Sequence, residues 1–258
     1  TPSSATVTIV SDDVLPDLSV SNLTVPARGA AGLVIQVTDT TANVGTGTSP
    51  ASTTSFYLSS NAVLETTDPI VGTRQVPELA AGISSSGTTQ VTLPDGLAPG
   101  SYSLFAMADG PRAVTESKEF NNTRLAFIQI GPDVAVTALT APNTAGAGST
   151  VLVSDTTANS GMGTASASVT RFYLSADFTL DSGDVPLQGR SVPALDGGVS
   201  SSGSTSVTIP ASTQDGVYYL FAKADATDVV PECNETNNTR TWLIRIGPDL
   251  VISTATAP

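Results

Sequence analysis

An internal repeat constrains the fold of this sequence more than any other feature. The dipeptides Pro16-Asp17, Pro132-Asp133 and Pro248-Asp249 begin three successive copies, spaced by 132 − 16 = 116 and 248 − 132 = 116 residues. The copies align without a gap, and about half of the paired positions are identical. Each copy is therefore expected to adopt the same fold, and a unit of this length can bury a core of its own.

The repeat divides the 258 residues into two complete units, 16–131 and 132–247, and two fragments. Residues 1–15 do not align with the repeat, but Ala5–Val10 alternates polar and apolar side chains as a strand does. We interpret residues 1–15 as the end of a preceding unit or as a strand donated to a neighbouring molecule. Residues 248–258 repeat the start of a unit and are expected to form the first strand of a third, whose edge and apolar face need a partner.

Period-two alternation of apolar side chains predicts an all-β fold, because helical periodicity with caps is absent. Seven strands in each unit favour an immunoglobulin-like or fibronectin-III-like β-sandwich. In the first unit the predicted strands are Leu18–Val25, Leu33–Asp39, Thr54–Ser59, Ile70–Val76, Thr88–Leu93, Ser101–Ala108 and Arg124–Ile130. Tyr102 and Tyr218 each follow a turn and enter a strand, as in a tyrosine corner.

Short Gly-Pro joints connect the copies, at Gly131-Pro132 and Gly247-Pro248. Such a joint has little reach and a restricted backbone. The sequence therefore predicts sandwiches that are arranged end to end as a semi-rigid rod.

The net charge and the length of the apolar runs limit the kinds of partner that this chain is expected to have. The chain has 10 basic and 23 acidic residues, which give a net charge of −13. Nucleic-acid binding needs a basic face, so no nucleic-acid partner is expected. No apolar run reaches the roughly 18 residues of a membrane helix, so we expect no membrane insertion in this segment.

The residue inventory argues against an enzyme. There is no histidine, which excludes Ser-His and Cys-His nucleophiles and histidine-ligated metals. Acidic residues that could form a catalytic pair recur in the same loops of each copy, unlike a single active site. The lone Cys233 has no partner for an intrachain disulfide.

The most distinctive stretch of each copy is the acidic loop before the last strand. The first copy has Asp109, Glu116, Glu119, Asn121 and Asn122, and the second has Asp225, Asp228, Glu232, Asn234, Glu235, Asn237 and Asn238. Calcium takes six to eight oxygen ligands of these types, so a Ca²⁺ site is one interpretation. The other is that these side chains bond to nearby backbone and stabilise turns without an ion.

A second oxygen-rich loop contains Asp177, Asp181 and Asp184. Its spacing does not match the calcium loop of an EF-hand, which needs ligands at alternate positions and a terminal Glu. A solvated hairpin loop is the alternative. The aromatic residues, 5% of the chain, are expected to point inward, and the lone Trp242 to pack in the core or at an edge.

Four motifs together resemble the CARDB domain, the cell-adhesion-related domain of bacteria. They are Pro-Asp at the start of each copy, Asp-Thr-Thr-Ala-Asn at residues 39–43 and 155–159, Phe-Tyr-Leu-Ser at 56–59 and 172–175, and the closing Glu and Asn-Asn residues. The resemblance covers residues 16–247 and the start of a third copy. It implies an immunoglobulin-like fold, tandem arrays on surface and secreted proteins of prokaryotes, and no catalysis. Here Asp-Thr-Thr-Ala-Asn is interpreted as a turn in place of the family's usual Asn-Thr-Gly.

The sequence therefore predicts an extracellular structural or adhesive repeat protein that forms a stalk, fibre or filament on a prokaryotic cell surface. Its expected partners are further copies of itself, joined by β-strand complementation, and host or surface glycans. The alternative is a ligand- or glycan-binding accessory module of a secreted enzyme.

Overall fold

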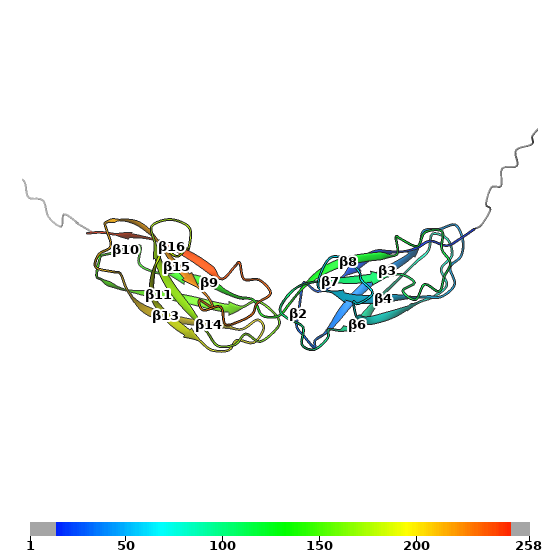
Figure 1. The fold of residues 1–258 in the computed structure, drawn as a ribbon, viewed down its shortest axis with the longest axis horizontal. Coiled ribbons are helices and arrows are strands. Elements are labelled where there is room, and N and C mark those ends of the chain that lie inside the picture. The colour runs from blue at the N-terminus through cyan, green and yellow to red at the C-terminus, as the bar shows by residue number, and fades with distance from the viewer. Residues whose placement is uncertain (1–13, 249–258) are drawn as a thin grey trace, which may run out of the picture. The chain divides into compact units, whose positions relative to one another are not determined.

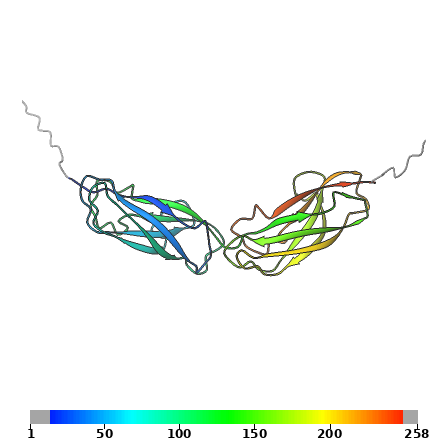
Figure 2. The same cartoon turned by 180° about the vertical axis from the view of Figure 1, so that it is seen from behind.

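The computed structural model describes residues 14–248 and contains only strands and loops over that range (Figures 1 and 2). The all-β fold predicted from the alternation is therefore confirmed. Within this range no helix has the length and apolar character needed to cross a membrane. Residues Ala5–Val10 and the third copy after Pro248 lie outside the described residues.

The first repeat folds into two sheets. The smaller sheet has the order β1-β3-β6, and the larger has the order β2-β8-β7-β4-β5. The strands are β1 (Leu18–Thr24), β2 (Arg28–Gly29), β3 (Val34–Asn43), β4 (Ser52–Ser59), β5 (Ile70–Val76), β6 (Ser84–Thr92), β7 (Gly100–Met107) and β8 (Thr123–Ile130). Sequence reasoning missed only the two-residue β2, which pairs in parallel with the end of β8 and is too short for periodicity to register.

The second repeat has the same two sheets, β9-β11-β14 and β10-β16-β15-β12-β13. Its strands are β9 (Val134–Thr140), β10 (Thr144–Ala145), β11 (Thr150–Asn159), β12 (Ser168–Ser175), β13 (Val185–Val192), β14 (Ser200–Thr208), β15 (Gly216–Lys223) and β16 (Thr239–Ile246). The equal strand order in both copies follows from the gapless repeat.

The chain divides into two compact units. One takes Gly32–Pro94 and Tyr102–Ile128 together with the segment that ends at Ala27, and the other takes Arg28–Ala31, Asp95–Ser101 and the chain from Gln129 onward. Each unit has its own apolar core.

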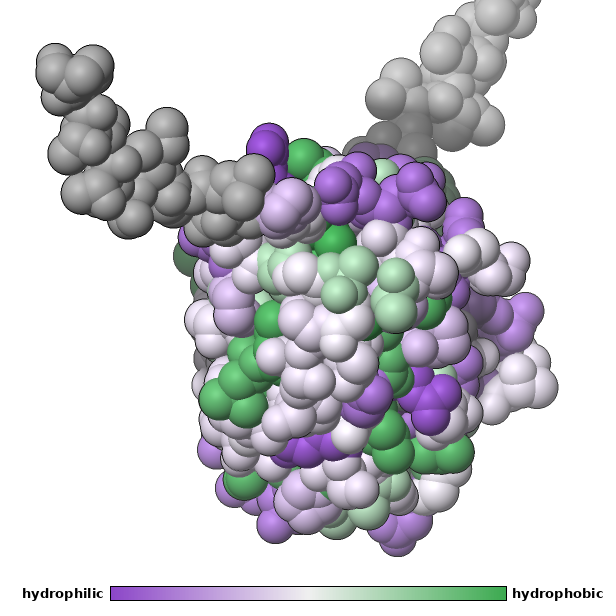
Figure 3. Space-filling view, turned by 90° about the vertical axis from the view of Figure 1, so that its left-hand side faces the viewer, coloured by the Kyte–Doolittle hydropathy of each residue, from purple (hydrophilic) through white to green (hydrophobic). Residues whose placement is uncertain are grey.

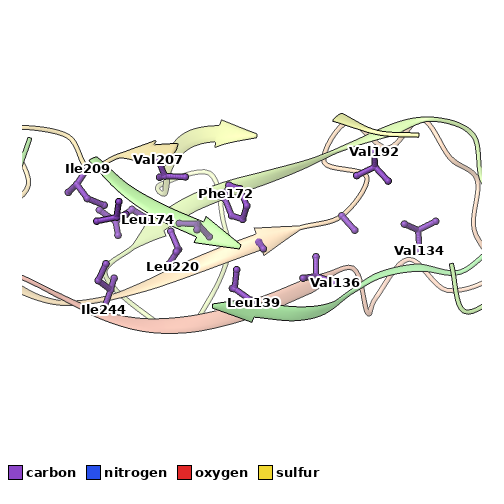
Figure 4. Close-up of a cluster of buried hydrophobic side chains, with 14 of the residues drawn as sticks. Val134, Val136, Leu139, Phe172, Leu174, Val192, Val207, Ile209, Leu220 and Ile244 are labelled. Carbon is purple, nitrogen blue, oxygen red and sulfur yellow. The ribbon is translucent and has the colours of Figure 1, made fainter. Parts of the chain in front are cut away.

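Alternate side chains of both sheets fill the core of the second repeat. Phe172, Leu220 and Ile244 of the larger sheet are fully buried. Figure 4 shows them pointing toward the space that Val207 also enters from the smaller sheet. Burying a Phe or Leu side chain contributes about 1.5–3 kcal/mol, so these layers supply the main stabilising term. Trp242 packs partly buried against this core, as expected.

The surface is a mixture of polar and apolar residues, and some of the exposed apolar residues are large, such as Phe120 and Phe178. On the face in Figure 3, hydrophobic residues occur in small groups separated by neutral and hydrophilic ones. Scattered exposure of this kind is ordinary for a soluble domain.

The stretch Asp39–Asn43 forms the second half of β3, so its interpretation as a turn is wrong. Asp39, Thr41 and Asn43 alternate inward and are fully buried. A strand can bury three polar side chains here because each finds partners inside the repeat, as Thr41 Oγ1 does at 2.7 Å from Thr54 Oγ1. The alternation pattern treats polar residues as exposed. The predicted strand therefore ends at Asp39, whereas β3 continues to Asn43.

Candidate functional site

The acidic loop connects the last two long strands of each repeat, and we call residues 108–122 and 224–238 the closing loops. Asp109 and Asp225 open them in the left-handed backbone region, at φ 45° and 40°. Asp is one of the few residues besides Gly that adopts this region readily. Both side chains are buried, and the Oδ2 atoms accept the backbone N–H of Val114 and Val230, each at 2.8 Å. These carboxylates therefore fix the bend of the loop.

A buried glutamate joins each closing loop to the first strand of its repeat. Glu116 Oε2 accepts the backbone N–H of Leu18 in β1, and Oε1 accepts Asn122 Nδ2 at 2.8 Å. In the second repeat Glu232 accepts the N–H of Val134 and Asn238 Nδ2 in the same way. Both oxygens of each carboxylate thus hold a hydrogen-bond donor.

The Pro-Asp dipeptide at the start of each repeat meets the same loop. Asn121 Nδ2 donates to Asp17 Oδ1 at 2.7 Å, and the N–H of Ser117 donates to the Pro16 carbonyl at 2.9 Å. Asn237 donates to Asp133 Oδ1 at 2.8 Å in the second repeat. Two motifs 104 residues apart in sequence are therefore in contact. We call this assembly the latch; it consists of Asp17, Glu116, Asn121 and Asn122 in the first repeat and of Asp133, Glu232, Asn237 and Asn238 in the second.

The remaining predicted acids lie around the latch or on the surface. Glu119 and Glu235 accept the backbone N–H of the buried glutamates, Glu116 and Glu232, at 3.1 and 3.0 Å. Asp228 pairs with Lys223 at 3.1 Å, and Asn234 accepts the N–H and hydroxyl of Thr236.

Burial raises the pKa of both latch glutamates. The pKa of Glu232 rises to about 7 because burial penalises the charged form, and the carboxylates of Glu235 and Asp225 add repulsion. The hydrogen bond from Val134 opposes the rise without cancelling it. The pKa of Glu116 is raised for the same leading reason. Burial therefore makes Glu116 and Glu232 bind a proton more tightly than an exposed glutamate does.

Some oxygens of the closing loops are buried with no hydrogen-bond donor. They are Oδ1 of Asn121 and Asn122 in the first repeat, and Oδ1 of Asp225, Asn237 and Asn238 in the second. Such oxygens are the kind that calcium takes as ligands. Among residues 14–248, no group of three or more His, Cys, Asp or Glu side chains is arranged to hold a metal ion. A cation in the second repeat would thus have one carboxylate oxygen, from Asp225, and the amide oxygens of Asn237 and Asn238 available to it.

The second predicted loop, with Asp177, Asp181 and Asp184, is an exposed connection between β12 and β13. Asp177 Oδ1 accepts the N–H of Thr179 at 2.8 Å, and Asp181 Oδ1 accepts that of Gly183 at 2.7 Å. Asp184 Oδ2 accepts the Asp181 N–H at 2.8 Å. These are local turn contacts within the loop itself.

Sequence reasoning missed a buried ion pair that connects the two sheets. Arg74 of β5 forms a bidentate contact with Asp39 of β3, Nε to Oδ1 at 2.6 Å and Nη2 to Oδ2 at 2.5 Å. Its guanidinium also donates to the Ser85 carbonyl at 3.1 Å. Arg190 and Asp155 repeat the contact in the second repeat. The recurrence of both residues at the repeat spacing was the available signal.

A second missed residue is Asn43, which bonds through its side chain with four backbone groups. Its Oδ1 accepts the N–H groups of Asp17 and Gly45, both at 3.1 Å, and Nδ2 donates to the carbonyls of Gly47 and Leu79 at 2.7 and 2.9 Å. Asn159 makes the equivalent four bonds. Every polar atom of the side chain is thus satisfied within the fold.

The expectation that aromatic residues point inward is only partly met. Phe56 and Phe172 are fully buried, but Phe120, Phe127 and Phe178 are exposed. Phe127 lies on the outward side of β8 by the alternation of the strand, whereas Phe120 and Phe178 lie in loops.

Comparison with known proteins gives one family and several solved domains. The CARDB family model matches residues 15–126 and 131–242. The crystal structure of a CARDB domain from Pyrococcus furiosus in complex with di-metal ions is 21% identical, covering 45% of this chain and 90% of that one (TM-score 0.36). A domain of a protein assigned to the cell surface of Methanosarcina acetivorans is 30% identical, covering 45% and 92% (TM-score 0.36). No curated protein matches the chain.

Proposed function

The chain belongs to the CARDB family, and on this premise we propose that it is a structural and adhesive part of an extracellular protein. Its repeats serve as modules of a stalk or fibre on a prokaryotic cell surface and carry out no catalysis. The surface assignment of the related Methanosarcina protein is extended here to this chain as part of the proposal.

The observation that carries this proposal is that the same buried polar residues do the same structural work in both repeats. Glu116 and Glu232 hold the first strand, and Arg74 and Arg190 hold the two sheets together. A catalytic site built from these buried polar residues would set one copy apart, because only one copy would need the reacting groups. Here the acidic residues stabilise each module, which suits a repeated mechanical element.

Surface labelling tests the location. Antibodies raised against the folded chain are applied to intact cells of the source organism and to permeabilised cells, with a cytoplasmic protein as the control. We expect labelling of intact cells at the level of permeabilised ones. Labelling that requires permeabilisation would overturn the extracellular assignment.

We also propose that copies assemble by β-strand complementation. The described chain leaves most of one strand edge open for this, because β10 pairs only with Arg245 and Ile246 of β16 (Thr239–Ile246). An unpaired edge accepts an added strand through backbone hydrogen bonds. The candidate donors, Ala5–Val10 and Leu250–Thr254, lie outside the described residues. Light scattering of the chain with and without residues 1–15 tests the idea; assemblies of unchanged size after the deletion would contradict it.

We propose Ca²⁺ as a stabilising ligand of the closing loops. The oxygens available to it in the second repeat are Oδ1 of Asp225, Asn237 and Asn238, which are buried and have no donor. A cation would also offset the repulsion from Glu235 and Asp225, which adds to the rise in the pKa of Glu232 that burial mainly causes. Bound calcium would supply charge compensation to a loop that is otherwise held by hydrogen bonds.

Thermal unfolding with calcium and with a chelator tests the calcium proposal. A ligand that binds only the folded state raises the melting temperature with its concentration. We expect a rise with millimolar Ca²⁺ that the Asn238→Leu variant loses and the surface variant Asn234→Leu keeps. Identical melting temperatures in calcium and in chelator would contradict the calcium proposal and would indicate that hydrogen bonds alone hold the closing loops.

A further inference from the structure

The outer face of the larger sheet in the second repeat carries an open groove over β12, β15 and β16. Its volume is about 620 Å³, and its lining includes Tyr173, Phe221, Lys223 and Thr241. The strand pattern explains this lining. Leu220 and Ala222 of β15 are fully buried in the core, so their neighbours Phe221 and Lys223 project from the opposite face.

Aromatic side chains form the floor and one wall of the groove. Phe178, in the loop after β12, is 68% exposed, whereas Phe221 beneath it is 4% exposed. The Phe178 ring meets Tyr219 edge-to-face with centroids 5.2 Å apart, and lies 6.4 Å from the Phe221 ring. Such contacts hold a ring in place without covering its outer side. Phe178 is therefore a fixed, exposed apolar surface.

Basic side chains lie beside this groove, although the chain as a whole has a net charge of −13. Lys223 and Arg240 line the groove, and Arg171 is the cross-strand partner of Lys223 in the register of β12 and β15. Asp228 pairs with Lys223 at 3.1 Å, and Asp181, which also lines the groove, accepts the N–H of Gly183. Arg171 and Lys223 thus place two cations on the outer face beside an aromatic floor, whereas Arg240 pairs with the buried Ala222 and so belongs to the inner face of β16.

The first repeat provides an internal comparison, because it has a groove at the equivalent place with different residues. That groove is lined by Tyr57, Met107, Glu119 and Phe120, among others. At the repeat spacing, Ser55, Ala62, Ser103 and Met107 stand where the second repeat has Arg171, Phe178, Tyr219 and Lys223. Arg171, Lys223 and the Phe178–Tyr219 ring pair are therefore specific to the second repeat, whereas Arg240 has its counterpart in Arg124, and the latch and the Arg–Asp pair are common to both.

We propose that this groove binds an acidic polysaccharide. A pyranose ring presents an apolar C–H face that packs on an aromatic side chain, and its hydroxyls find partners such as Thr241. Carboxylate or sulfate groups on the sugar pair with Arg171 and Lys223, and the guanidinium of Arg171 can hold a carboxylate in a bidentate contact.

An added peptide strand fits this face poorly. β12 is already paired with β13 and β15, and β15 with β12 and β16, so their backbone groups are taken. Recognition on this face must therefore use side chains, which suits stacked sugar rings. The inference rests on the proposed extracellular function, and it names the ligand class for the adhesive role.

Isothermal titration calorimetry of the full chain tests the proposal with polygalacturonate as the probe, and with dextran and poly-glutamate as the neutral and peptide comparisons. The test variants take residues from the first repeat: Arg171→Ser, Lys223→Met and Phe178→Ala. All three positions lie on the outer face, so the fold is expected to persist. Arg124→Ser, on β8 of the first repeat, is the control with the same charge change.

We expect polygalacturonate to bind and dextran not to bind. Arg171→Ser and Lys223→Met should each weaken binding by about threefold, and the two together by about tenfold, as expected for exposed ion pairs. Phe178→Ala should also weaken binding by about threefold, because the sugar ring loses its aromatic contact. Arg124→Ser should leave binding unchanged.

Three results would overturn the proposal: no binding of polygalacturonate, an equal loss in Arg124→Ser, or poly-glutamate binding as tightly with no effect of Phe178→Ala. The last result would indicate an acidic peptide as partner. None of them would alter labelling of intact cells, so failure of the ligand assignment is distinguishable from failure of the extracellular assignment.

Discussion

Replacing Arg74 with methionine tests whether the buried ion pair holds the two sheets of the first repeat together. Asp39 is fully buried, and the Arg74 side chain is only 10% exposed. Methionine keeps the apolar stem but removes both charge-assisted bonds to Asp39 and the bond to the Ser85 carbonyl. Removing one partner of a buried pair costs about 3–5 kcal/mol, because the other charge stays buried without compensation.

Differential scanning calorimetry measures the effect directly. At about 4 °C for each kcal/mol in a domain of this size, the first repeat should melt roughly 12–20 °C lower. Arg190→Met should produce the same shift in the second repeat, where Arg190 pairs with Asp155. The exposed Arg124→Met should change the free energy of unfolding by less than about 0.5 kcal/mol.

A double variant separates the ion pair from simple packing. Replacing both partners, in Asp39→Val with Arg74→Met, removes the uncompensated charge and should restore much of the stability. A loss of less than about 1 kcal/mol in Arg74→Met would refute the reasoning. So would a double variant that is less stable than the single one, because the cost would then come from lost packing.

Four further predictions concern the latch, the backbone contacts and the tyrosine corner. Because the pKa of Glu232 is about 7 when folded and 4.5 when unfolded, the folded state binds the proton more tightly. Stability of the second repeat should therefore fall as pH rises from about 4.5 to 7. In pH-dependent urea unfolding, Glu232→Gln should remove the contribution of the second repeat to that slope and leave the contribution of Glu116 in the first repeat. Asn159→Ala should cost about 3 kcal/mol or more in urea unfolding, because four backbone groups lose a partner; a loss below 1 kcal/mol would contradict this. Gly45→Ala should cost about 1–3 kcal/mol by calorimetry, since a Cβ there would lie 2.5 Å from Asp17 N and 2.6 Å from Leu15 O. Tyr218→Phe should cost about 1 kcal/mol by the loss of its 3.1 Å bond to the Gln214 carbonyl, and an unchanged midpoint would show that this bond is dispensable.

Sequence patterning predicted the strands well because one face of each strand is buried and the other is not. β5 (Ile70–Val76) was predicted with its bounds, although its alternation is weak. The errors occurred where buried positions are polar. Asp39, Thr41 and Asn43 interrupt the apolar pattern, and only their partners on other strands explain why they are inside.

The candidate site was predicted in its residues but not in its chemistry. The recurrence of the acidic and Asn-Asn residues in both closing loops indicated that these loops are important. It could not show that Glu116 accepts a backbone N–H from Leu18, a contact between residues 98 positions apart. The outer-face groove was also invisible, because the aromatic residue of the loop after β12, Phe178, has no counterpart in the first repeat.

Single-molecule force extension of the full chain most directly tests the claim that the repeats are equivalent, independently stable structural modules. Each repeat of 132 − 16 = 116 residues holds roughly 400 Å of extended chain, less the length of the folded repeat. The account predicts two unfolding events with equal length increments. A single event, or two events of clearly unequal length, would contradict it.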